Sequence, residues 1–90
     1  MGYDTKYGKV TTEFGEIPDD EQVIVFRARD KNVPELLDDY LELCELSGSP
    51  QHHLDLITDS HDRISKWQEE NPDRVRVPNS NRYMERIAKG

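Results

Sequence analysis

Apolar residues in residues 33–44 recur with the spacing of an α-helix. They follow an i, i+3, i+4 pattern, which places them on one stripe: Val33, Leu36, Leu37, Tyr40, Leu41 and Cys44. Asn32 and Glu35 have the spacing of a capping box, which predicts that the helix begins there. Pro34 fits the first turn, and Gly48 stands where a C-terminal cap glycine belongs.

A second apolar stripe follows directly. Ser49 and Pro50 are typical of an N-cap and a first helical residue, and Asn71-Pro72 ends the pattern. The stripe consists of Leu54, Ile57, His61 and Ile64. Because only one or two residues would join the two helices, we expect an antiparallel helical hairpin.

Three further stretches have the composition of β-strands. Residues 6–14 are rich in β-branched and aromatic residues and predict a strand or half of a hairpin. Residues 23–26 are four consecutive apolar residues, typical of a strand that is covered on both faces. In residues 74–77 valine alternates with arginine, which predicts an edge strand closed by Pro78.

These elements predict an α+β fold, in which a small sheet with the order β-β-α-α-β is covered on one face by the helical hairpin. We expect residues 1–78 to form a single domain. Residues 79–90 would be a C-terminal tail, partly ordered or docking on a neighbour.

Composition predicts a small core and an acidic surface. Apolar residues make up 33% of the 90-residue chain, so self-association as a homo-oligomer would be a direct way to bury more area. Residues 13–70 hold 16 acidic and 5 basic residues, and this excess disfavours general nucleic-acid binding. The single cysteine excludes an intrachain disulfide, and no apolar run is long enough for a membrane span.

Two surfaces are candidates for binding a partner. The first is the outer face of the first helix, where no lysine or arginine stands at i+4 to neutralise a row of carboxylates: Glu35, Asp38, Asp39, Glu42 and Glu45. Such a row could dock on a basic patch of another protein, it could stand in for a phosphate backbone, or it could simply be a solvated face. The second is an aromatic and cationic lip formed by Tyr3, Lys6, Tyr7 and Lys9, which could stack a flat anionic ligand or be an ordinary strand end.

The histidines are the candidates for chemistry. His52, His53 and His61 lie close in sequence to several aspartates, yet they match no strong metal or catalytic motif. A structural role for each of them is favoured over a catalytic one. We therefore expect no catalytic residue, no metal and no cofactor.

Several motifs carry a resemblance that extends over roughly residues 1–78. They are KYGKVTTEFGEIPDDE at residues 6–21, VIVFRARD at 23–30, GSPQ at 48–51, HLDLI at 53–57, WQ at 67–68 and RVRVP at 74–78. The chain resembles small accessory proteins of tailed bacteriophages that infect mycobacteria and related actinobacteria. The resemblance implies expression in the host cytoplasm and work in host takeover or counter-defence. It assigns no activity, cofactor or catalytic residue.

Three classes of function remain open. The leading hypothesis is a non-enzymatic protein that binds a host protein through the acidic helix face. The alternative is an oligomeric sponge that traps a nucleotide-derived ligand between subunits, with anion contacts from Lys6, Lys9, Arg27, Arg29 or Arg76. The least favoured class is a small metal- or histidine-dependent enzyme.

Overall fold

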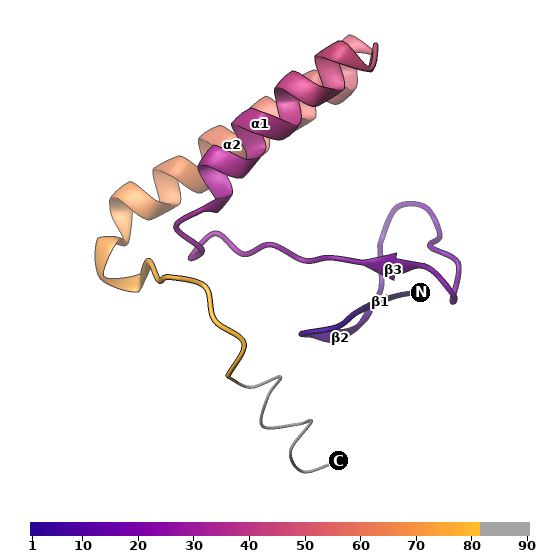
Figure 1. The fold of residues 1–90 in the computed structure, drawn as a ribbon, viewed down its shortest axis with the longest axis horizontal. Coiled ribbons are helices and arrows are strands. Elements are labelled where there is room, and N and C mark those ends of the chain that lie inside the picture. Colours follow the sequence, from indigo (N-terminus) through magenta and orange to yellow (C-terminus); the bar gives the residue numbers. More distant parts are fainter. Residues whose placement is uncertain (82–90) are drawn as a thin grey trace. The chain divides into compact units, whose positions relative to one another are not determined.

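The computed structural model describes residues 1–81 and confirms the α+β class, with a small mixed sheet of three strands and two helices that pack together (Figure 1). The chain divides into two compact units. The N-terminal unit comprises Met1–Val25 and, of the described C-terminal residues, 79–81. The helical unit comprises Phe26–Pro78. The predicted covering of the sheet by the helices stays a prediction, as does the single domain over residues 1–78.

The sheet of the N-terminal unit has the strand order β2-β1-β3. Its strands are β1 (Gly2–Asp4), β2 (Gly8–Val10) and β3 (Gln22–Val23). β1 runs antiparallel to β2 and parallel to β3. β2 lies inside the predicted strand at residues 6–14 and is half of a hairpin, whereas the central strand β1 was not predicted. The sequence Gly-Tyr-Asp has no alternating apolar pattern that would indicate a strand.

The prediction of a strand buried on both faces at residues 23–26 is wrong. Only Gln22 and Val23 pair with β1, and the side chain of Ile24 is 71% exposed. β1 ends at Asp4, so the chain beyond Val23 has no further strand to pair with. The four apolar side chains of residues 23–26 are therefore not buried, although the run has them on both sides of the chain.

Asp4 is a buried carboxylate at the end of β1 and is 2% exposed. Its Oδ1 accepts hydrogen bonds from the backbone N–H groups of Lys6 and Tyr7, at 2.8 and 2.7 Å. Its Oδ2 accepts a third from the backbone N–H of Val25, at 2.7 Å. The bond from Tyr7, followed by those from Val25 and Lys6, holds the pKa of Asp4 below its ordinary value although desolvation opposes this. One side chain thus ties the hairpin turn to the segment that follows β3.

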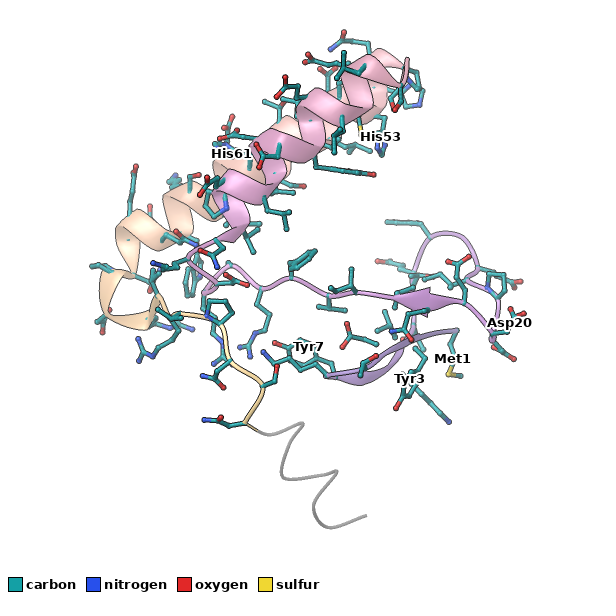
Figure 2. The ribbon with its side chains drawn as sticks, viewed as in Figure 1. Met1, Tyr3, Tyr7, Asp20, His53 and His61 are labelled. Atoms are coloured by element: carbon teal, nitrogen blue, oxygen red, sulfur yellow. The ribbon has the colours of Figure 1, made fainter. Side chains whose placement is uncertain are left out.

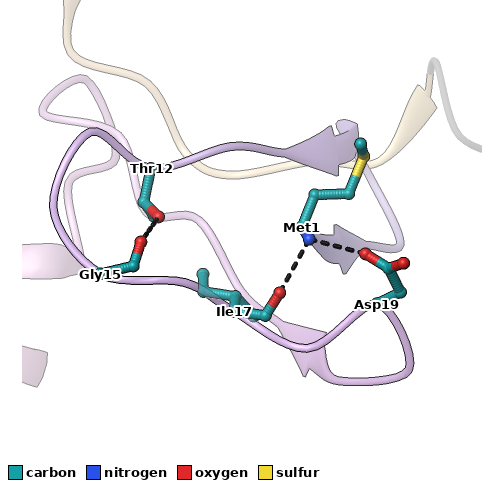
Figure 3. A network of polar contacts seen from close by, with 5 residues as sticks. All are labelled: Met1, Thr12, Gly15, Ile17 and Asp19. Carbon is teal, nitrogen blue, oxygen red and sulfur yellow. Dashed lines mark hydrogen bonds and ion pairs between the residues drawn. The ribbon is translucent and has the colours of Figure 1, made fainter.

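The connection between β2 and β3 is closed by polar contacts (Figure 3). The hydroxyl of Thr12 donates to the carbonyl of Gly15 at 2.6 Å. The ammonium of Met1 donates to the carbonyl of Ile17 at 2.7 Å and pairs with Asp19 at 2.8 Å. This ammonium lowers the pKa of the Asp19 carboxyl.

The helical unit contains α1 (Val33–Leu46), α2 (Gln51–Glu70) and a short 3-10 helix η1 (Pro72–Arg74). α1 and α2 pack along each other (Figure 1). Their contact buries Val33, Cys44 and Ile57, all of which belong to the predicted apolar stripes. Half-buried side chains flank these three: Leu37, Leu41, Leu54 and Ile64.

The chain reverses between the helices at Gly48, which has a φ of +80°. The N–H of Gly48 donates to the carbonyl of Glu45, and that of Ser49 donates to the carbonyl of Cys44. These two bonds form a Schellman motif, for which glycine is the preferred residue. The predicted cap glycine is therefore in place.

The predicted side-chain caps are not formed. Asn32 makes no side-chain cap bond; instead its backbone N–H donates to Oδ1 of Asp30, and the carbonyl of Asp30 accepts from Val33. α2 begins one residue later than expected, with Pro50 rather than Ser49 as its N-cap. In α2 the N–H of His53 donates to the carbonyl of Pro50, so in each helix a first-turn N–H has a backbone acceptor in place of a capping side chain.

The predicted edge strand at residues 74–77 is reduced to one parallel bridge between Asp30 and Arg76. The N–H of Arg76 donates to the carbonyl of Arg29 at 2.8 Å, and the N–H of Lys31 donates to the carbonyl of Arg76 at 3.1 Å. η1 takes up residues 72–74, so little extended chain is left for pairing. Residues 82–90 of the predicted tail lie outside the described residues.

Candidate functional site

The acidic face of α1 is as exposed as its sequence predicts. Its carboxylates are all exposed: Glu35, Asp38, Asp39, Glu42 and Glu45. Among the described residues none of them forms an ion pair with a lysine or arginine, and Asp38 alone contacts a histidine, with 3.3 Å between its Oδ1 and Nε2 of His61. At 1.5 Å per residue the row extends about 15 Å along the helix.

Exposed apolar side chains border this acidic face. Leu43 is 60% exposed and Leu46 is 79% exposed, whereas Cys44 between them is buried against α2. At 100° per residue, Leu43 falls between the buried stripe and the carboxylates, and Leu46 falls among the carboxylates, between Asp39 and Glu42. α1 therefore presents a mixed surface of leucines and carboxylates to solvent.

The predicted aromatic and cationic lip separates into two pairs. Tyr3 and Lys9 face each other across β1 and β2, and both line a small hollow of about 270 Å³. In the turn, Nζ of Lys6 lies 5.4 Å from the ring centre of Tyr7. Figure 2 shows Tyr3 and Tyr7 on the hairpin, where Tyr3 is 50% and Tyr7 41% exposed. The described contacts do not bring the four side chains together around one ligand.

His53 and His61 lie at different points along α2 (Figure 2) and have different neighbours. His53 meets the ring of Tyr40 edge-on, with 6.4 Å between ring centres. His61 lies between Asp38 of α1 and Asp62, and His52 is exposed. A hydrogen bond between Tyr40 and Cys44 raises the pKa of the Tyr40 hydroxyl. Within residues 1–81 no three side chains of metal-ligand type converge.

The helical unit also contains a pocket that the sequence did not predict as a site. Its volume is about 380 Å³, and it is lined by Arg27, Ala28, Arg29, Trp67, Arg74 and Arg76. Sequence reasoning named Arg27, Arg29 and Arg76 only as possible anion contacts between subunits, and it missed Trp67 and Arg74. Arginine occupies every second position in both residues 27–29 and residues 74–76, and this shared pattern could have predicted that the two segments contribute to one pocket.

Backbone contacts bring the two arginine segments together. The bridge between Asp30 and Arg76 joins them directly. Nε2 of Gln68 donates to the carbonyls of Ala28 and Asp30, at 2.8 Å each, and so fixes the first segment to the end of α2. Cζ of Arg74 lies over the ring of Trp67, 4.7 Å from the ring centre.

Among residues 1–81, no carboxylate lines this arginine pocket. Among the described residues, neither Arg29 nor Arg74 nor Arg76 forms an ion pair. Arg76 donates to the carbonyls of Asp73 and Val75, and Arg74 to the side chain of Asn71. Since a guanidinium has five N–H donors, these contacts leave donors for a ligand.

In the part of the chain that the structure describes, no helix combines the length and apolar character of a transmembrane segment. Comparison with models of protein families, with curated proteins and with solved structures finds no match for the chain. Its function has to be inferred from the two surfaces of the helical unit: the acidic face of α1 and the arginine pocket.

Proposed function

We propose that the protein acts without catalysis, in the cytoplasm of an infected bacterium, by binding a host protein through the acidic face of α1. The observation that carries this proposal is the row of exposed carboxylates that no described lysine or arginine neutralises. The partner would present a basic patch of matching length.

The energetics of α1 support a role for these carboxylates beyond solubility. Like charges at i, i+3 and i+4 destabilise a helix by a few tenths of a kcal/mol per pair. Glu42 and Glu45 also lie in the second half of α1, towards the negative end of the helix dipole. α1 has no basic residue in its last turn to offset this. A basic partner would relieve both unfavourable terms.

Leu43 and Leu46 offer apolar surface that a partner could bury, which the carboxylates do not. Rim charges mainly raise the association rate and set the choice of partner, whereas buried apolar anchors provide most of the affinity. Leu43 and Leu46 are exposed beside the carboxylates and could be buried by a partner. The partner would thus combine a basic patch with an apolar recess.

A matched pair of variants tests the proposal. The first replaces Glu35, Glu42 and Glu45 by glutamine, and the second replaces Glu13, Glu16 and Glu21 by glutamine. Both sets are exposed, both changes are isosteric, and both alter the net charge equally. The partner would be purified from actinobacterial lysate, and its affinity for each variant measured with purified components at several salt concentrations.

We expect the α1 variant to bind about tenfold more weakly or worse, with a shallower salt dependence, and the control to bind as the parent does. Equal affinities of the two variants would contradict the proposal. Self-association as a homo-oligomer also stays a prediction, and native mass spectrometry of the same samples measures it.

A second candidate function, sequestration of a small anionic ligand, is supported by the arginine pocket. Arg27, Arg29 and Arg76 meet within one chain, whereas the sequence suggested that they would act between subunits. Lys6 and Lys9 belong to the N-terminal unit and are not part of this pocket. The enzyme hypothesis gains no comparable support, because the described histidines do not converge.

A further inference from the structure

The arginine pocket concentrates positive charge in an acidic unit. Residues 26–78 contain seven basic and twelve acidic residues, yet four of the seven basic residues line this one pocket. Cations held close together repel one another, and a nearby carboxylate is the usual remedy. Since the described part of the lining supplies no carboxylate to Arg29, Arg74 and Arg76, an anionic ligand is the group that would stabilise these three arginines.

The kind of side chain favours a phosphate or a carboxylate as the anion, and the combined positive charge of several arginines favours the more highly charged phosphate. Arginine presents a planar fork of N–H donors that matches two oxygens of one phosphate, and lysine does not. The cations of this pocket are all arginines. The main chains of Arg29 and Arg76 are joined by the 2.8 Å bond from the N–H of Arg76 to the carbonyl of Arg29, and both residues line the pocket. Two arginines that line one pocket can bind a ligand with more than one phosphate group.

Trp67 and Arg74 add a site for a flat ring. Cζ of Arg74 lies over the tryptophan ring, 4.7 Å from its centre. A guanidinium that rests on an aromatic ring by one face can take a second planar group on the other. Stacking is a common way in which proteins hold a nucleobase without recognising which base it is. The volume of about 380 Å³ falls within the range of small-molecule sites.

We propose that the arginine pocket binds a nucleoside phosphate with at least two phosphate groups. Arg29 and Arg76 bind the phosphates, and the base stacks on the Arg74–Trp67 pair. The inference rests on the second candidate function and names its ligand class. It needs no partner subunit, because one chain supplies all of these side chains.

The chain offers its own reporter, since Trp67 is its single tryptophan. Full-length protein would be titrated with ADP, inorganic pyrophosphate, adenosine and a short single-stranded oligonucleotide, following Trp67 emission and the heat of binding. We expect ADP to bind with a change in Trp67 emission. Pyrophosphate should bind at least about fivefold more weakly through loss of stacking, and adenosine more weakly still through loss of the phosphates.

Substitutions distinguish binding of ADP in the arginine pocket from an effect of the overall charge of the protein. Arg29→Ala and Arg76→Ala should each weaken ADP binding about tenfold or more, and Arg29→Lys should weaken it less because the charge remains. The matched control is Arg63→Ala, since Arg63 lies on α2 outside the pocket and pairs with Asp59 at 2.7 Å. Far-UV circular dichroism verifies that each variant is folded, and the lysine variant serves if the alanine variant is not.

Each outcome decides the matter. Absence of binding by both ADP and pyrophosphate at millimolar concentration would overturn the ligand class and the sequestration function together. Pyrophosphate binding as tight as that of ADP would overturn the nucleoside assignment and leave anion sequestration standing. Oligonucleotide binding tighter than ADP binding would assign the pocket to a nucleic-acid strand instead. An equal loss of ADP affinity in Arg63→Ala would show that the overall charge of the protein, and not the pocket, determines binding.

Discussion

Gln68 fastens the end of α2 to the segment that carries Arg27 and Arg29, so its removal tests how the arginine pocket is assembled. Its Nε2 donates to the carbonyls of Ala28 and Asp30, at 2.8 Å each, in a partly buried setting. A neutral hydrogen bond contributes a net 0.5–1.5 kcal/mol, roughly. Gln68→Ala should therefore lower the free energy of unfolding of the helical unit by about 2 kcal/mol.

A chain of this size has a free energy of unfolding of only about 5 kcal/mol or somewhat more, so this loss is large. With a urea m-value of about 1 kcal/mol/M, the midpoint of unfolding should fall by about 2 M. The neighbouring Trp67 reports the transition by its fluorescence. Gln51→Ala is the matched control, because Nε2 of Gln51 donates only to the exposed Asp55 carboxylate on the same helix.

We expect the control to change the free energy of unfolding by less than about 0.5 kcal/mol. If Gln68→Ala and Gln51→Ala shift the midpoint equally, the two bonds to the Ala28–Asp30 segment do not hold it in place. Gln68→Glu provides a second test, because its carboxylate would face two carbonyl oxygens. Its penalty should be present at neutral pH and diminish as the pH falls through the raised pKa of the introduced glutamate.

Two further predictions concern single residues, one in each unit of the chain. Gly48→Ala should destabilise the helical unit by about 1 kcal/mol, because its φ of +80° disfavours a side chain although nothing lies within 4 Å of the added methyl. Thermal unfolding followed by circular dichroism at 222 nm measures it, and an unchanged midpoint relative to Ser47→Ala would contradict the Schellman cap. Ionised Asp4 should stabilise the N-terminal unit above its ordinary pKa of 3.8, a contribution that is lost as the pH falls through its lowered folded pKa. NMR shifts of the Tyr7 and Val25 amides against pH measure this, and Asp4→Asn should flatten the profile whereas Asp20→Asn should not.

The sequence by itself determined the two helices to within a residue or two. Their 3.6-residue apolar period, the glycine at position 48 and Asn71-Pro72 are local signals, and local signals act whatever the rest of the chain does. The exposure of the carboxylate row on α1 was also readable, because the buried stripe fixes which side of the helix faces outward.

Only the tertiary structure decided which strands pair and which cations meet. The apolar run at residues 23–26 stays largely exposed because its neighbour β1 ends at Asp4, and nothing in the run itself reveals that. The arginine pocket exists because the bridge between Asp30 and Arg76 joins segments far apart in the chain, with Gln68 holding one of them. Helix formation depends on neighbours along the chain, whereas strand pairing and charge clustering depend on residues that only folding brings together.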